Sequence, residues 1–248
     1  ILREIMESEI VRLHLNEDRE SAAEVLARFD FIAVPVVDDS GGMVGIVTHD
    51  DIIDVIQQEA TEDLQRQAGI GPIEGNYLEA GFVRVWWSRV TWLSLVFLAQ
   101  MFSINAMATF EAELEAVAAL AAFVPLCLSV GGNSGSQAAT LVIRALALGH
   151  IDVSDWLRVF RRELLMGLAL AVSLGVLAII RTWFATPSNL ITGSDHLIKL
   201  TYVITFAVIG ICLWGVLVGS LLPLLIRWRG LDPALISSPA IATISDVS

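Results

Sequence analysis

The sequence predicts an α/β module at its N-terminal end, followed by an all-α polytopic membrane domain. Two observations lead to this fold class. Hydrophobic residues make up 55% of the 248 residues and the mean hydropathy is +0.70, both high for a soluble protein. Charged residues make up only 17%, yet the net charge is −12, and the acidic residues gather before the long apolar runs that recur from Val90 onward. Polar and apolar residues are therefore segregated, which indicates two domains.

The segment 10–58 follows the order strand, helix, strand, strand, helix. A VRLHL run alternates apolar and polar positions, as a half-buried strand does. The NEDRESAAEVLARFD run after it has helical periodicity, with Asn16 or Asp18 as the expected N-cap. Two β-branched strands then flank a DDSGG turn, and the second strand leads into another helix.

A GIVTHDDI signature lies where that second strand meets the helix. Gly45, Thr48 and Asp51 fit a pattern of Gly, two apolar residues, Thr or Ser, two further residues and Asp. On these residues the segment resembles a CBS motif, and we assign 1–58 to a CBS-like regulatory domain whose partner motif is expected upstream. The resemblance implies binding of an adenine nucleotide such as ATP through Thr48 and Asp51. The alternative is that both residues only cap the helix.

Residues 59–84 are predicted to form an acidic linker helix that is broken at a GIGP run. Acidic side chains here and in the preceding helix suit a regulatory divalent cation such as Mg²⁺. The alternative is a solvated helix face that binds no ion. The candidate regulatory ligands are Asp50, Asp54, Glu59, Glu62 and Asp63.

Residues 85–248 form the predicted membrane domain. Crossing the hydrocarbon core takes about 20 residues, and four apolar runs reach that length. A fifth run follows an LDP sequence and is cut off at Ser248, so we predict five spans with the fifth truncated. The four complete runs cover residues 87–110, 117–148, 164–183 and 200–226.

The distribution of arginine predicts the orientation of these spans. Arginines are frequent before the first run and in the connections after the second and fourth runs. By the positive-inside rule these segments face the cytoplasm. The CBS-like head is therefore predicted to be cytoplasmic, in a multi-pass protein of the cell membrane.

Polar residues interrupt the second apolar run. The Gly131–Gly132 pair allows either local unwinding or close approach of two backbones. Four oxygen-bearing side chains follow at positions i, i+3, i+4 and i+7, on one helical face. Neutral oxygens suit a hard, hydrated cation, whereas the alternative is hydrogen bonding between helices. These four residues are Asn133, Ser136, Gln137 and Thr140.

Asp246 is a carboxylate inside the fifth apolar run, and an acid within the membrane is costly enough to suggest a function. With this residue, the GGNSGSQAATLVIRALALG and LDPALISSPAIATISDVS runs and the order of CBS motif before membrane domain, the chain resembles the MgtE-type magnesium channels over nearly its whole length. Ser136 departs from the family pattern, since many members have Asn there.

The resemblance implies a homodimer whose second and fifth spans line a pore for Mg²⁺ uptake. The net charge of −12, concentrated in the head and linker helix, predicts that cytoplasmic Mg²⁺ neutralises these acidic surfaces and so closes the pore. Asp246 corresponds to the family's pore carboxylate, with a backbone carbonyl one helical turn earlier. The metal-site residues implied are Asp246, Ala242, Asn133, Gly131 and Gly132.

Two other functions stay open from the residues alone. One is transport of another divalent cation, such as Co²⁺ or Mn²⁺, and the other is a nucleotide-responsive membrane receptor that transports nothing. The acidic head argues against nucleic-acid binding because it repels phosphate. No nucleophile–base pair or metal-hydrolase spacing indicates an enzyme, so the expected partners are membrane lipid and a second copy. The sequence starts without Met and stops inside an apolar run, so we expect it to be a piece of a longer protein.

Overall fold

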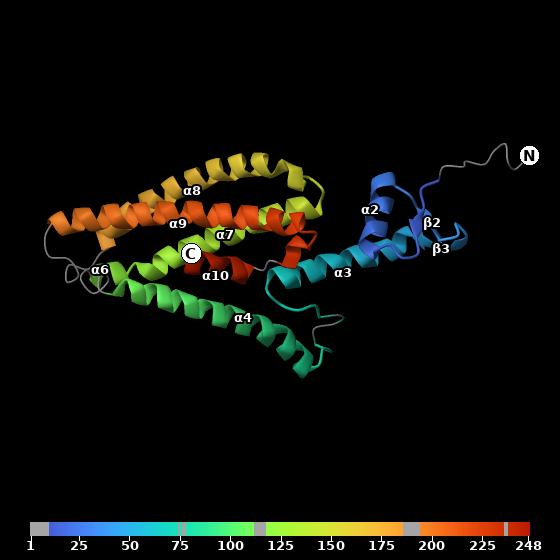
Figure 1. Ribbon diagram of the computed structural model, residues 1–248, viewed down its shortest axis with the longest axis horizontal. Helices are drawn as coiled ribbons and strands as arrows, with labels where there is room; N and C mark the ends of the chain where they lie inside the picture. Colours follow the sequence, from blue (N-terminus) through green and yellow to red (C-terminus); the bar gives the residue numbers. More distant parts are fainter. Residues whose placement is uncertain (1–9, 74, 76–77, 112–117, 186–193, 236–237) are drawn as a thin grey trace, which may run out of the picture. The chain divides into compact units, whose positions relative to one another are not determined.

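The computed structural model describes residues 10–73, 75, 78–111, 118–185, 194–235 and 238–248 (Figure 1). The chain clusters into two compact units, Ile1–Leu64 and Gln65–Ser248. The boundary between them falls inside a helix, later than the domain end predicted at residue 58.

The first unit is a three-stranded sheet with two helices. The strand order is β1-β2-β3, in which β1 is parallel to β2 and β2 is antiparallel to β3. The predicted order of elements is confirmed, although the first strand is shorter than the VRLHL run. The elements are β1 (Leu13–His14), α2 (Arg19–Phe29), β2 (Ala33–Val37), β3 (Met43–Thr48) and α3 (His49–Gln67).

The core of this unit joins both helices to the sheet. Leu26 of α2, Val34 of β2 and Ile52 of α3 are almost completely buried in one cluster. On β3, by contrast, Met43 and Ile46 remain more than half exposed. One sheet edge therefore keeps uncovered apolar side chains.

The predicted DDSGG turn between β2 and β3 is held by Asp38. Its Oδ1 accepts hydrogen bonds from the Ser40 hydroxyl at 2.6 Å and from the Gly42 backbone N–H at 2.8 Å. Gly41 has a φ of 80°, which glycine adopts without strain. The Ser40 side chain, followed by the Gly42 N–H, holds the pKa of Asp38 below its ordinary value because both donors favour the charged carboxylate.

Helix α3 ends where the GIGP run was predicted to break it. Gly69 has a φ of 72° and its N–H donates to the carbonyl of Arg66 at 2.8 Å. The Gln65 side chain then fixes the chain that follows, because its Oε1 accepts from the Ile73 N–H at 2.7 Å. A glycine in the left-handed region is a common helix stop.

The second unit is entirely helical among the described residues. Three helical segments are long and apolar enough to cross a membrane: residues 82–109, 153–184 and 196–228. The second predicted span corresponds to the helix Val124–Ala147, which is not apolar enough to be counted with these three. The fifth corresponds to the helix Ser238–Val247, which is too short at 10 residues, so five spans are not established. The helices are α4 (Phe82–Thr109), α6 (Ala118–Ala121), α7 (Val124–Ala147), η1 (Val153–Asp155), α8 (Trp156–Ala185), α9 (Ser194–Trp228), η2 (Pro233–Leu235) and α10 (Ser238–Val247).

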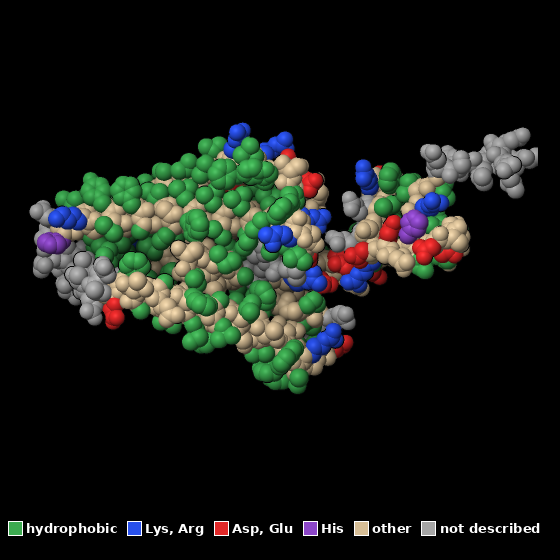
Figure 2. Space-filling model, viewed as in Figure 1, with side chains coloured by type: hydrophobic (Ala, Val, Ile, Leu, Met, Phe, Trp, Pro, Cys, Tyr) green, Lys and Arg blue, Asp and Glu red, His purple; other side chains and the backbone are tan. Residues whose placement is uncertain are grey.

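Helix α9 packs against both α8 and α7, and α10 lies against α7 and α4 (Figure 1). Figure 2 shows apolar side chains over most of the visible surface of this helical unit, with charged side chains gathered towards its ends. This distribution is the one expected for a protein surrounded by lipid rather than water.

Glycines set the distance between α7 and α9. The carbonyl oxygen of Gly131 contacts Gly215, and the carbonyl oxygen of Gly135 contacts Gly219. Both pairs are spaced by four residues, so each helix presents a small-xxx-small face to the other. A Cβ added to Gly215 would also lie 2.8 Å from the Ser134 hydroxyl, so no larger residue fits.

Candidate functional site

The Gly131–Gly132 pair lies within a continuous α-helix, so the local unwinding considered from the sequence is not found. The pair instead allows close approach, which was the other prediction. A Cβ added to Gly131 would lie 2.7 Å from Cγ2 of Ile211 on α9. A Cβ added to Gly132 would lie 3.0 Å from the Cβ of Ala242 on α10. Two predicted metal-site positions, Gly132 and Ala242, are therefore direct neighbours.

Helices α7 and α10 run antiparallel in a regular register. Gly132 of α7 faces Ala242 of α10. One turn later along α7, the Ser136 hydroxyl donates to the carbonyl of Ser238, which lies one turn earlier along α10, at 3.2 Å. Four residues are close to one helical turn, so the register continues in whole turns. Extended by one turn in the other direction, the same register places Asp246 at the level of Leu128, next to Ser129.

Asp246 has a polar partner on a third helix. The Gln100 side-chain Nε2 on α4 donates to Oδ2 of Asp246 at 3.3 Å. Among the described residues Asp246 forms no salt bridge, so its charge is balanced only by a neutral amide. A carboxylate in this position is well suited to attract a cation.

The four polar residues predicted to share one face of α7 lie within a continuous helix. Asn133, Gln137 and Thr140 are exposed, whereas Ser136 is half-buried by its bond to α10. The Asn133 side-chain Nδ2 donates to the Ser129 hydroxyl at 3.0 Å, one turn earlier. The amide oxygen of Asn133 accepts no hydrogen bond from a described residue and is available to a hydrated ion.

Ser129 belongs to this face although the sequence reasoning did not select it. It is exposed, lies four residues before Asn133, and is level with Asp246 in the α7–α10 register. Extending the i, i+4 spacing backward by one turn would have found it. The Thr140 hydroxyl, in contrast, donates to the carbonyl of Ser136 at 2.9 Å within its own helix.

The Ala242 carbonyl lies on the same side of α10 as Asp246, one turn before it. In an α-helix the carbonyl of residue 242 accepts from the N–H of residue 246. A carbonyl oxygen has a second lone pair, so it can still bind a water of a hydrated cation. Ala242 is half-buried against Gly132, so a hydrated cation can reach its carbonyl oxygen only from the side of α10 that α7 leaves uncovered.

In the N-terminal unit, Thr48 and Asp51 bind each other. Both the backbone N–H and the hydroxyl of Thr48 donate to Oδ2 of Asp51, the former at 3.2 Å. This arrangement caps the start of α3, which was the alternative to nucleotide binding. The Asp51 carboxylate is exposed, and both of these hydrogen bonds go to the same one of its oxygens.

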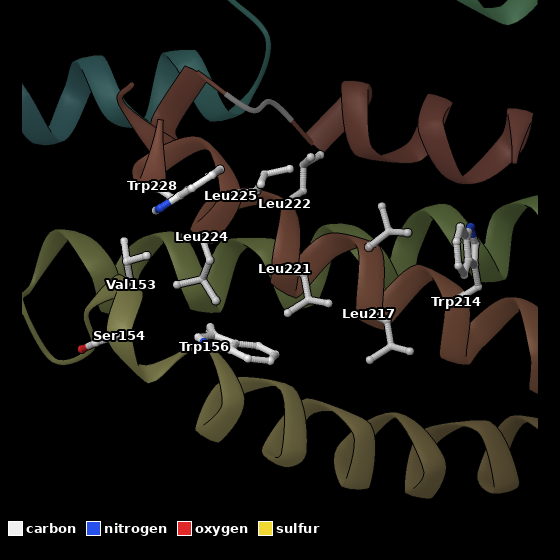
Figure 3. A pocket seen from close by; sticks show the side chains of 11 residues that line it. Val153, Ser154, Trp156, Trp214, Leu217, Leu221, Leu222, Leu224, Leu225 and Trp228 are labelled. Carbon is white, nitrogen blue, oxygen red and sulfur yellow. The ribbon is translucent and has the colours of Figure 1, made fainter. Parts of the chain in front are cut away.

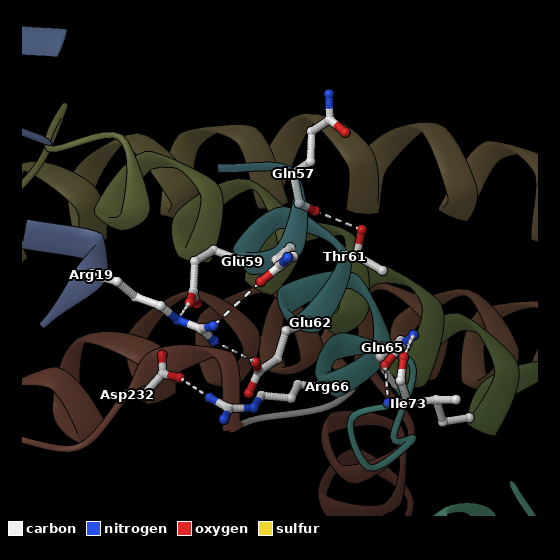
Figure 4. A network of polar contacts seen from close by, with 10 residues as sticks. Arg19, Gln57, Glu59, Thr61, Glu62, Gln65, Arg66, Ile73 and Asp232 are labelled. Carbon is white, nitrogen blue, oxygen red and sulfur yellow. Dashed lines mark hydrogen bonds and ion pairs between the residues drawn. The ribbon is translucent and has the colours of Figure 1, made fainter. Parts of the chain in front are cut away.

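Two of the five candidate regulatory ligands are held by an arginine. Arg19 of α2 contacts Glu59 at 2.6 Å and Glu62 at 3.7 Å (Figure 4). Asp50 and Asp54 are exposed near the start of α3. Within the described part of the chain, no three His, Cys, Asp or Glu side chains converge as a metal site.

A salt bridge in the helical unit was not predicted. Arg66, near the end of α3, contacts Asp232 at 2.7 Å, and the other oxygen of Asp232 accepts from the Ala234 N–H at 2.8 Å (Figure 4). Nearby, the Trp92 ring of α4 lies against Gly69, so a side chain there would collide with it. The end of α3 is thus tied to the start of η2 by Arg66, and the following Gly69 lies against α4.

Comparison with known proteins gives two domain matches. A family model described as the divalent cation transporter MgtE matches residues 124–248, and a CBS-domain model matches residues 2–58. The first match takes in both α7 and α10, and the second covers the predicted CBS-like module.

Three curated relatives match nearly the whole chain, and each carries the name magnesium transporter MgtE. Identity is 41% to the Thermus thermophilus protein, 31% to that of Enterococcus faecalis and 30% to that of Bacillus subtilis. These matches cover 99%, 100% and 99% of this chain but 52% of each relative, so the chain spans about half the length of the curated relatives it matches. Since the transporter model covers half of the chain, including both helices of the candidate site, the chain belongs to the MgtE family of divalent cation transporters.

Proposed function

We propose that this chain is part of a magnesium transporter in which α7 and α10 line the ion pathway and Asp246 binds the ion. The observation that carries the proposal is the antiparallel register of these two helices. It brings the one carboxylate on either helix level with Ser129 and one turn from Asn133. A carboxylate beside neutral oxygens is a combination that suits a hydrated divalent cation.

The chemistry of these donors favours Mg²⁺. This ion loses its water reluctantly and is usually bound through one or two carboxylates with several waters retained. Neither α7 nor α10 presents a His, and the Cys127 thiol lies outside the polar face, so softer metals gain nothing here. The names of the three relatives point to the same ion.

A second copy of the chain would complete the pathway. The exposed amide and hydroxyl groups on α7 are costly if they face lipid. A two-fold partner that covers them would bring two Asp246 carboxylates and two polar faces to one axis, as a symmetric dimer requires. We therefore propose a homodimer with the pathway at its interface.

Regulation by cytoplasmic Mg²⁺ is the further part of this proposal. Glu59 and Glu62 share Arg19, and Asp50 and Asp54 are exposed on the same helix. Mg²⁺ at high concentration would compete with Arg19 for these carboxylates and change how α2 and α3 pack. ATP would have to replace the Thr48–Asp51 contact to bind at that turn.

Ion flux into liposomes that hold the full-length protein tests the pathway. We expect Asp246→Asn to abolish Mg²⁺ uptake because it removes the charge but keeps the side-chain shape. Asp39→Asn, which removes a carboxylate from an exposed turn, serves as the matched control and should leave uptake unchanged. Undiminished uptake by Asp246→Asn would refute the assignment, and faster uptake of Co²⁺ or Mn²⁺ than of Mg²⁺ would refute the ion.

A further inference from the structure

A long apolar groove runs beside α9, where this helix faces η1 and the start of α8. Its volume is about 810 Å³ and its walls come from α9, the start of α8 and η1 (Figure 3). Trp228 and Trp156 lie at one end and Trp214 at the other (Figure 3). Apart from Ser154, every lining side chain is apolar or aromatic.

The groove has the length of one membrane leaflet. From Trp214 to Trp228 the helix advances fourteen residues, or about 21 Å at roughly 1.5 Å per residue. Half of a bilayer with its headgroups is about 20–22 Å thick. The Trp214 ring nitrogen donates to the Ser248 hydroxyl at 2.7 Å, so its polar atom is satisfied at the deep end.

Positive charge gathers at the other end. The Arg229 guanidinium lies 5.5 Å from the centre of the Trp228 ring, which lines the groove. Ser154 also borders a smaller hollow of about 340 Å³ that includes Arg158 and Arg161. Arg158 is paired with Asp155 at 2.6 Å, whereas Arg161 and Arg229 have no acidic partner among the described residues. Asp152, a further acid near this end, caps η1.

We infer that this groove binds a phospholipid with an anionic headgroup. Its acyl chain lies along Leu217, Leu221 and Leu225, and its phosphate meets Arg229 with Arg161 at the tryptophan end. Tryptophan and arginine at the level of lipid headgroups are a common combination at membrane surfaces. The charge at one end distinguishes this groove from an ordinary lipid-facing helix surface, and the inference does not depend on which ion is transported.

The charge contribution can be separated with two neighbouring arginines. Arg229 follows Leu225 by four residues and shares its face, whereas Arg227 follows it by two and points about 200° away. A basic residue near an anionic surface contributes about 1 kcal/mol, which is about fivefold in affinity. Arg229→Gln should therefore lower the preference for anionic lipid about fivefold, and Arg227→Gln should have little effect.

The experiment is native mass spectrometry of the full-length protein released from nanodiscs of equal parts phosphatidylglycerol and phosphatidylcholine. The wild type should retain phosphatidylglycerol in excess. Arg229→Gln should lose that excess, Arg229→Lys should restore it, and Val218→Phe, which fills the groove, should reduce the lipid retained.

Three results would overturn the inference. One is equal retention of the two lipids by the wild type, and another is equal loss in Arg227→Gln and Arg229→Gln. The third is a change from dimer to monomer in Val218→Phe with lipid retention unchanged, which would show that a second copy covers the groove.

Discussion

Replacing Gly135 by alanine tests the glycine contacts between α7, α9 and α10. A Cβ at this position would lie 2.9 Å from the carbonyl oxygen of Gly215 and 3.0 Å from Cγ2 of Ile241. Both distances are shorter than ordinary contacts, and the first neighbour is backbone that cannot rotate away. Overpacking of this kind costs typically about 1–3 kcal/mol.

Gly210 on α9 provides the matched control. A Cβ there meets no atom within 4 Å, so Gly210→Ala keeps only the gain in helix propensity, at most about 1 kcal/mol. The same gain applies to Gly135→Ala, so the two variants should differ by about 1–3 kcal/mol in the free energy of unfolding. At roughly 2–4 °C per kcal/mol for a chain of this size, the difference in Tm is about 2–12 °C.

Thermal unfolding of both variants in the same detergent measures this difference, and Mg²⁺ flux should fall in Gly135→Ala because α10 is displaced. Equal melting temperatures of the two variants would refute the reasoning, because they would mean that α7 can move away from α9 and α10 with no loss in the free energy of unfolding. A lower Tm with full flux would instead show that the contact supports the fold but not the ion pathway.

Three further predictions concern side chains. A double-mutant cycle with Arg66→Ala and Asp232→Asn should give a coupling of only about 0.2–1 kcal/mol, since the side chains are 32% and 42% exposed, and a larger coupling would contradict this. Asp38→Asn should remove part of the acid sensitivity of the N-terminal unit, measured by unfolding against pH. The lowered pKa of Asp38 contributes stability that is present above the unfolded value near 3.9 and lost as pH falls through the folded value. Gln100→Leu should raise the KM for Mg²⁺ flux roughly tenfold, because it removes the donor to Asp246, and an unchanged KM would exclude that role.

Features that depend on neighbouring residues were predictable from the sequence. The strand and helix order of the first unit follows from local alternation and turn residues, and the break after α3 follows from the GIGP run. The polar face of α7 follows from helical spacing alone, since a continuous helix must place Asn133 and Gln137 on one side.

Features that depend on distant residues were not predictable in this way. The sequence shows Gln100 and Asp246 as separate polar residues in apolar runs, yet their contact joins positions 146 residues apart. The Arg66–Asp232 bridge joins positions 166 residues apart. A single sequence holds no record of which helices pack together, so spacing identifies a face but not its neighbour.

The backbone contact between α7 and α9 restricts where this protein can move. Side chains that interdigitate can change rotamer and let two helices slide, but carbonyl oxygens seated against glycine leave no such freedom. We therefore expect α7 and α9 to behave as a fixed frame. Any widening beside Asp246 must then come from displacement of α10, or of α4, which packs against α10.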